Sequence, residues 1–467
     1  MLDTVAPELP SDLDWLNISA RPARLVGSAC ALVFINAGSV WSQQRLHELL
    51  ELQSRFSDRL RVLAVHVPRF DFERQPDQVR DQLAVNGLRM PVALDPQWSL
   101  WRQFGIEAWP TTLLISHAGR IVERLVGAGD RQALESAVAS LCAGAPVVAV
   151  EPQEPRRTDT ALLYPSGVAV LGSYVYVADT RHHRILECDQ AGRIIRQFGT
   201  GVAGMVDGPA DLAAFRNPQE VSVQRGALYV ADAGNHAVRR IDLRSGDVVT
   251  LCGSGRPGSP VPGPVANPTA MSLDAPRSVA LLGGELYIAC AGDNRIWSYD
   301  LGTRMMRMEA GSGALTIRDG NGSFAAFAQP ISLSAAHHTL YVCDEAGSAI
   351  RSFNARSGQV TTLVGSDPWT FGNRDGNRND ARLQAPQAIA LDPDSPQLWI
   401  ADSGNGSLRT LRLGGGEMKT VPTPEPLQSP SALAAVDGSL WIADAGAHAI
   451  WRLDRHSGQM RRLPIGE

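Results

Sequence analysis

The sequence predicts a multidomain chain in which an α/β domain is followed by an all-β repeat domain. At 467 residues the chain is too long for a single hydrophobic core, so two or more domains are expected. One short apolar motif recurs six times in the second part, at a spacing of roughly 40 to 60 residues that is typical of β-propeller blades. The 44 glycines and 30 prolines fit the many turns of such a repeat.

The recurring motif is best seen at residues 228–232, Leu-Tyr-Val-Ala-Asp. Each copy has a large apolar residue, an aromatic residue, a β-branched residue and a small residue, and five of the six copies end in aspartate. The copies lie at residues 174–179, 228–232, 286–290, 340–344, 398–402 and 440–444. A proline and a second apolar run precede each copy; these leading prolines are Pro165, Pro218, Pro276, Pro330, Pro386 and Pro430. We therefore predict six blades within residues 161–467.

The first domain, residues 1–145, alternates strand and helix patterns. Buried apolar runs predict strands, and apolar residues at helical spacing predict helices between them. The expected strands are 31–35, 60–67, 91–94, 109–115 and 120–126, and the expected helices are 43–56, 76–85, 99–104 and 130–141. Asp130 is a plausible N-cap of the last helix. The order is β-α-β-α followed by β-β-α.

This layout, with Trp109-Pro110-Thr111 before a strand and Ala118-Gly119 in the hairpin after it, resembles the thioredoxin-like proteins of the redoxin type. The resemblance implies that the peptide bond before Pro110 is cis and that Pro110 faces the active-site motif. It also implies a Cys-x-x-Cys motif between the first strand and its helix.

That motif is absent here, because residues 36–42 read Asn-Ala-Gly-Ser-Val-Trp-Ser. Ser39 and Ser42 occupy the places of the two cysteines. A hydroxyl cannot form a disulfide, so we expect no dithiol oxidoreductase activity. The six cysteines each lie in or beside an apolar run, which favours buried free thiols, Cys30 included, in a reducing compartment.

The groove of a thioredoxin-like domain survives the loss of its thiols. In the family, the loop before the cis proline pairs with an extended peptide, and here Trp41 and Trp109 would flank that groove beside Pro110 and Thr111. This suggests a peptide- or protein-docking site with aromatic walls. Alternatively, both tryptophans pack the first domain against the propeller.

The repeats at residues 178–185 and 231–238 resemble the NHL repeat, whose hallmark is Asp, then a turn with Asn-His, then a basic and a branched residue. The aspartates that end the motif are expected to hold the backbone of a neighbouring turn rather than to bind a cation as a ring. NHL-type propellers include a metal-dependent lyase, which makes His183, His236 and His448 weak metal candidates. One blade apart, they are expected to lie too far from one another to share an ion.

A second repeat lies between the blades: Asp207-Gly208, Asp319-Gly320 and Asp375-Gly376 each precede a short apolar cluster and then a leading proline. We expect Asp-Gly to form a turn, followed by a helical turn that places an apolar residue on the propeller.

The two halves together resemble the thioredoxin-like/NHL-propeller fusion proteins. With a net charge of −5, no basic half, no apolar segment of membrane-spanning length and no signal peptide, we expect no nucleic acid, no membrane and a cytoplasmic protein. Residues 146–160, rich in proline and charge, are expected to be a linker. The leading hypothesis is a non-catalytic protein- or peptide-binding scaffold without a cofactor. The alternative is a metal-dependent hydrolase or lyase in the propeller channel, and a thiol-disulfide oxidoreductase is a third.

Overall fold

The computed structural model describes residues 4–18, 25–147, 160–258 and 263–466. The chain divides into two compact units, Met1–Arg157 and Thr158–Glu467, and each is described by itself. Almost all of the predicted linker, residues 146–160, lies outside the described residues. The division nevertheless falls within that stretch of the sequence.

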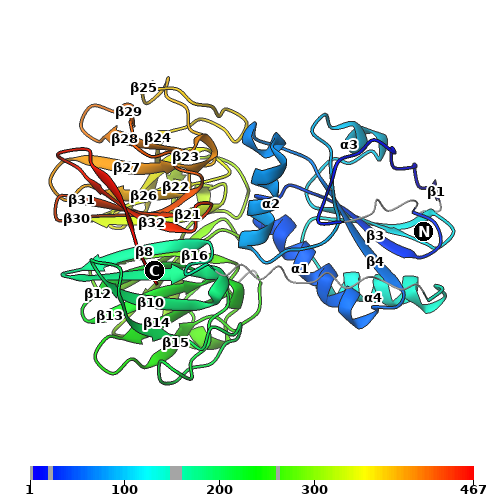
Figure 1. Ribbon diagram of the computed structural model, residues 1–467, viewed down its shortest axis with the longest axis horizontal. Helices are drawn as coiled ribbons and strands as arrows, with labels where there is room; N and C mark the ends of the chain where they lie inside the picture. Colours follow the sequence, from blue (N-terminus) through cyan, green and yellow to red (C-terminus); the bar gives the residue numbers. More distant parts are fainter. Residues whose placement is uncertain (1–3, 19–24, 148–159, 259–262, 467) are drawn as a thin grey trace. The chain divides into compact units, whose positions relative to one another are not determined.

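The first unit is a seven-stranded mixed sheet, drawn in blue and cyan in Figure 1. Its strands run in the order β1-β7-β6-β3-β4-β5-β2, with β3, β4 and β5 parallel and β6 and β7 antiparallel to their neighbours. The strand bounds are β1 (Thr4–Val5), β2 (Trp15–Leu16), β3 (Ala29–Ile35), β4 (Leu60–His66), β5 (Val92–Leu94), β6 (Thr111–Ile115) and β7 (Arg120–Val126). The sequence pattern did not predict the two-residue edge strands β1 and β2, which are too short to show alternation.

The helices of this unit are α1 (Val40–Arg55), α2 (Pro76–Val85), α3 (Ser99–Gln103) and α4 (Arg131–Ala143), with a 3-10 turn at Phe72–Arg74. Alternate residues of β3 point to opposite faces of the sheet. Val33 belongs to the core that includes α1, α2 and α4, whereas Leu32 belongs to the core that includes α3. The predicted cap of the last helix is confirmed, because the Asp130 side chain accepts the N–H of Ala133 at 3.1 Å.

The second unit is a six-bladed propeller, drawn from green to red in Figure 1. The innermost strands are β8 (Pro165–Leu171), β12 (Pro218–Gln224), β16 (Pro276–Leu282), β21 (Pro330–Ala336), β26 (Ala388–Leu391) and β30 (Pro430–Val436). The second strands are β9 (Tyr174–Asp179), β13 (Ala227–Asp232), β17 (Glu285–Cys290), β22 (Thr339–Asp344), β27 (Gln397–Asp402) and β31 (Ser439–Asp444). The third are β10 (Arg184–Asp189), β14 (Ala237–Asp242), β18 (Arg295–Asp300), β23 (Ala349–Asn354), β28 (Ser407–Arg412) and β32 (Ala449–Asp454). The outermost are β11 (Ile194–Phe198), β15 (Val248–Cys252), β19 (Met306–Ala310), β24 (Gln359–Val364), β29 (Glu417–Val421) and β33 (Met460–Leu463).

The ring closes without a strand borrowed from the start of the unit. The sixth blade contains its own outermost strand, β33, which pairs with β32. Its innermost strand β30 packs beside β8 of the first blade, and the two blades share one apolar core that includes Val168, Trp441 and Ile450. Residues 161–163 form no strand.

The Asp-Gly repeat does not form the expected turn. In the fourth and fifth blades it forms a short edge strand, β20 (Gly320–Asn321) and β25 (Gly376–Asn377), which pairs with the outermost strand. In the second blade Gly208 makes a single bridge to Val248. These glycines have φ between 135° and 146°, a backbone region that side chains disfavour. The glycine is thus required by an extended edge conformation, not by a hairpin turn.

Candidate functional site

The two serines of the altered motif serve the start of α1. Ser39 is the N-cap: its hydroxyl accepts the N–H of Ser42 at 3.4 Å, which places the helix start three residues before the predicted one. Ser42 is fully buried, and its hydroxyl accepts the N–H of Asn36 at 3.2 Å. Both hydroxyls therefore hold backbone N–H groups of the loop and the first helical turn.

Buried polar side chains form hydrogen bonds with the loop that precedes these serines, at Asn36 and Ala37. Glu73, 1% exposed, accepts the side-chain amide of Asn36 at 2.6 Å and the N–H groups of Arg69 and Phe70. The Nδ1 atom of His66 accepts the N–H of Ala37 at 3.2 Å, so Nε2 carries the proton that it donates to the carbonyl of Glu73. Burial lowers the pKa of His66, which keeps the ring neutral.

This geometry offers no activated nucleophile at the motif. Both ring nitrogens of His66 bond backbone groups, so His66 is not placed as a base for Ser39 or Ser42. All six cysteines are buried and unbonded to one another. Burial raises the pKa of Cys30 to about 11, against the opposing charge of Arg61, so its thiolate is scarce at neutral pH.

Trp109 lies in a cluster of three tryptophans beside the proline of the predicted groove. Its ring centroid is 5.3 Å from that of Trp98 and 4.9 Å from that of Trp101. The Trp109–Pro110 peptide bond is cis, as the resemblance implies, and the hydroxyl of Thr111 donates to the carbonyl of Ala108 at 2.7 Å. Trp109 is therefore a partly exposed aromatic side chain whose ring packs against two other tryptophans.

Trp41 lies on the first turn of α1, partly exposed, between the two serines. Trp98 and Trp101 are residues of this site that the sequence analysis did not identify. Trp98 is the N-cap residue of α3, with φ of 60°, and Trp101 lies within the helix. Their contacts with each other and with Trp109 depend on the tertiary fold. His66 and Glu73 were missed for the same reason.

In the propeller, the repeated aspartates are structural. Each of the five is fully buried and accepts a backbone N–H from the segment leading into its own blade. The N–H groups belong to Leu163, Arg216, Ala328, Gln384 and Ser429, at 2.7 to 2.8 Å. The expectation of a backbone role is confirmed, although these partners lie before the blade; Asp444 accepts the N–H of Ala447 in the following turn as well.

Three blades add a buried arginine that bridges two aspartates. In the second blade Arg239 is fully buried, donating to Asp232 at 2.9 Å and to Asp207 at 2.7 Å. Its guanidinium lies 5.1 Å from the ring centroid of Phe215. Arg351 and Arg409 repeat this arrangement with Asp344 and Asp319 and with Asp402 and Asp375. The aspartate of each Asp-Gly pair thus fixes a connecting segment to its blade.

The three candidate metal-binding histidines each form a hydrogen bond with the next blade. Each lies in the left-handed backbone region, with φ of 48° to 53°, and uses Nδ1 to accept an N–H of the next blade. His183 accepts from Asn217 at 3.2 Å, His236 from Ala275 at 3.2 Å, and His448 from Tyr164 at 3.0 Å. Asn294 and Ser348 do the same with their side-chain oxygens toward Gln329 and Ala385. Throughout the described ranges, no three His, Cys, Asp or Glu side chains gather closely enough to hold a metal ion.

Comparison with known proteins agrees with this architecture. No family model matches the sequence. The protein SUPPRESSOR OF QUENCHING 1, chloroplastic, of Arabidopsis thaliana is 31% identical over 440 residues, which cover 87% of this chain and 41% of that protein. NHL repeat-containing protein 2 of Gallus gallus is 29% identical over 459 residues, covering 88% of this chain and 62% of that protein. The chain is a homologue of the thioredoxin-like/NHL-propeller fusion proteins.

The first domain of this fusion protein has a shorter relative as well. The thiol-disulfide oxidoreductase YkuV of Bacillus subtilis is 24% identical over 133 residues, covering 28% of this chain and 90% of that protein. The chain spans less than two thirds of the longer relatives, 41% of the plant protein and 62% of the chicken protein. No helix in the described part of the fusion protein has the length and apolarity needed to cross a bilayer. The architecture fits a scaffold or a redox-related role.

Proposed function

We propose that this fusion protein is a non-catalytic scaffold whose thioredoxin-like domain binds a protein or an extended peptide. One observation supports this most strongly: both thiol positions are hydroxyls engaged in holding the helix start, beside a tryptophan surface that remains partly exposed. A serine pair cannot exchange disulfides. Large, rigid aromatic side chains are the residues that most often dominate binding energy at protein interfaces.

The proposed docking surface is formed by Trp41 and Trp109, which are partly exposed, whereas Pro110 and Thr111 of the predicted groove are buried and support Trp109 from behind. Trp109 loses little conformational freedom on binding because Trp98 and Trp101 already restrict its ring. Pre-organised groups of this kind favour binding because less entropy is lost on association. The buried free thiols fit a reducing compartment, and a cytoplasmic location is part of this proposal.

The proposal is tested with a peptide selected on the full chain from a random phage-displayed library and measured by calorimetry. Trp109→Ala should weaken binding at least tenfold, the effect of roughly 1.4 kcal/mol or more expected for an aromatic anchor. Trp369→Ala is the matched control, because Trp369 is an exposed tryptophan, 61% accessible, in the propeller. Trp109→Phe, which keeps an aromatic ring, should retain most of the affinity.

Two results would contradict this function. One is a selected peptide that binds wild type and Trp109→Ala equally while Trp369→Ala abolishes binding. The other is reduction of insulin disulfides by the wild-type protein with a small-thiol reductant. A Ser39→Cys/Ser42→Cys variant shows whether that assay would detect a dithiol at these positions.

A further inference from the structure

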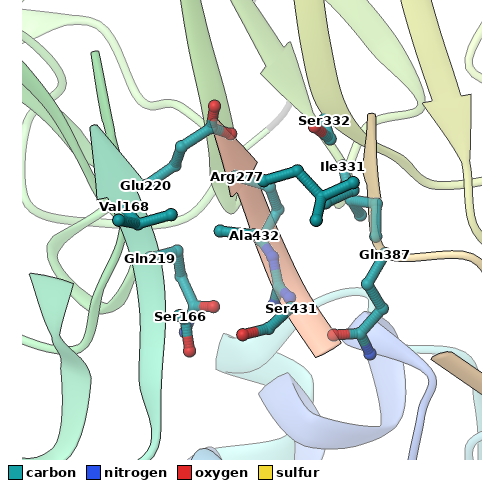
Figure 2. A pocket seen from close by; sticks show the side chains of 12 residues that line it. Ser166, Val168, Gln219, Glu220, Arg277, Ile331, Ser332, Gln387, Ser431 and Ala432 are labelled. Carbon is teal, nitrogen blue, oxygen red and sulfur yellow. The ribbon is translucent and has the colours of Figure 1, made fainter. Parts of the chain in front are cut away.

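The residue that follows the leading proline occupies the same place in all six blades. These six residues are Ser166, Gln219, Arg277, Ile331, Gln387 and Ser431, and together they line one hollow among the innermost strands of the propeller. Figure 2 shows their side chains around this hollow, with Arg277 between Gln219 on one side and Gln387 on the other. Five of the six are polar, in a region where each blade could have contributed an apolar side chain.

A backbone irregularity directs these residues inward. In five blades the pairing of the innermost strand with the next shifts register just after the leading proline. Such a bulge changes the direction in which neighbouring side chains point. Consequently two consecutive residues of the second blade, Gln219 and Glu220, both line the hollow instead of alternating between two faces.

Arg277 stands apart from the other arginines inside the propeller. Arg239, Arg351 and Arg409 each form ion pairs with two aspartates. Arg277 makes no hydrogen bond and no ion pair with any residue that the structure describes. Burial lowers the pKa of Arg277, and the charges of Glu345 and Glu220 only partly oppose this effect. The Arg277 side chain is nevertheless partly exposed and faces the hollow, so its guanidinium can pair with an anion that enters there.

Gln219 is a second donor at this place that lacks a partner. Its residue is 5% exposed, and within the described ranges its side-chain amide makes no hydrogen bond. The neighbouring polar groups are engaged: Ser166 donates to the carbonyl of Tyr164, Ser431 to that of Pro165, and Gln387 to Glu345. Two side chains from adjacent blades, the Arg277 guanidinium and the Gln219 amide, therefore have N–H groups available to a ligand in the hollow.

The space in front of these donors is small. The hollow has a volume of about 410 Å³ when the part open to solvent is counted, but the centre of a water molecule can lie in only about 20 Å³ of it. That room suits one or two ordered waters, or the two oxygens of a single carboxylate. A guanidinium holds a carboxylate through two parallel hydrogen bonds. The negative charge of Glu345 nearby disfavours a dianion such as phosphate.

We propose that the propeller channel binds one carboxylate group through Arg277 and Gln219. The carboxylate is carried by a small organic acid or by the C-terminal residue of a peptide that reaches into the hollow. The site is independent of the proposed groove in the thioredoxin-like domain, and either can fail without the other.

The test uses the full chain, with binding measured by calorimetry and by thermal shift at constant ionic strength. Sodium acetate is the small-acid probe, acetyl-Gly-Gly with a free carboxylate is the peptide probe, and its C-terminal amide is the matched control ligand. Arg277→Gln should abolish binding of both carboxylates and, because it removes an unpaired charge, should leave the melting temperature unchanged or higher. Arg225→Gln, which alters an exposed arginine on a propeller hairpin, should bind as wild type does.

Gln219→Ala should weaken acetate binding about threefold to tenfold, the loss of one hydrogen bond; this variant provides the test if Arg277→Gln does not fold. Acetate binding alone assigns the site to small acids, whereas a peptide carboxylate that binds at least tenfold more tightly than acetate and its own amide assigns it to a chain terminus. The proposal is overturned if wild type binds neither carboxylate, if Arg277→Gln or Gln219→Ala binds as wild type does, or if inorganic phosphate binds more tightly than acetate.

Discussion

Arg239→Met should destabilise the propeller far more than the loss of a surface arginine. The Arg239 guanidinium is fully buried and donates to Asp232, to Asp207 and to the carbonyls of Ala214 and Val206, at 2.7 to 3.0 Å. Methionine fills much of the same volume but leaves Asp232 without its cation. Removing one member of a buried ion pair typically costs about 3 to 5 kcal/mol.

The lower end of that range is expected here. Asp232 keeps the N–H of Arg216 and the amide of Asn235 after the substitution, and burial already raises its pKa to about 6, so it can take up a proton when the cation is lost. Asp207→Asn should cost less, about 1 to 2 kcal/mol, since the Asp207 side chain is 48% exposed. The double variant Arg239→Met/Asp232→Asn should recover part of the loss.

Urea unfolding of the full chain, followed by circular dichroism, measures these differences, and hydrogen exchange localises them to β12–β15. Arg193→Met is the matched control, because Arg193 is 77% exposed and pairs with Asp189 at 3.2 Å on the surface. That substitution should change the free energy of unfolding by less than about 1 kcal/mol. If Arg239→Met and Arg193→Met unfold at the same urea concentration, the buried pair does not hold the blade as described.

Three further predictions concern the channel, the blade junctions and the thiols. Burial raises the pKa of Glu220 to about 8, with Ser278 and Arg277 opposing, so wild type loses stability as the pH rises from 5 through 8. Glu220→Gln should gain stability relative to wild type over that interval, and a constant difference in urea midpoint between pH 5 and pH 8 would contradict this reasoning. His448→Ala should lower stability by roughly 1 kcal/mol because it removes the bond to Tyr164, while His448→Asn should retain most of it in thermal unfolding; equal losses would count against the junction bond. Ellman's reagent should find almost no reactive thiol in the native protein and six after denaturation, and rapid modification of native protein would show an accessible thiolate.

The blades could be predicted from the sequence because each repeat carries its own signals. The alternating apolar runs and the leading proline mark two strands of every blade, with a final aspartate in five of the six, and the structure confirms these strands. The Asp-Gly repeat was misjudged as a turn because its glycine is also suited to an extended edge strand. A readable signal was overlooked: blades with Asp207 or its counterparts have arginine at the third residue of the third strand, as in Arg239.

The sites were harder to predict because they depend on contacts between distant segments. Serines at positions 39 and 42 could be read directly, but the tryptophan cluster joins α3 to the segment before β6. The six residues that line the hollow all follow a leading proline, so they could have been identified from the sequence. Their inward direction depends on a bulge, which apolar alternation does not reveal. The lack of a partner for Arg277 follows from the packing of the ring as a whole.

The side-chain bond from one blade to the next has a consequence for how such a ring can change over time. Histidine, asparagine and serine all make it, and the group that receives it is a backbone N–H, which every residue except proline possesses. This bond therefore does not depend on the side chain of the residue in the next blade, in contrast to the apolar contacts between blades. A blade that is added or replaced can keep this one bond, whatever its first residue, while its apolar face must still match that of its neighbour.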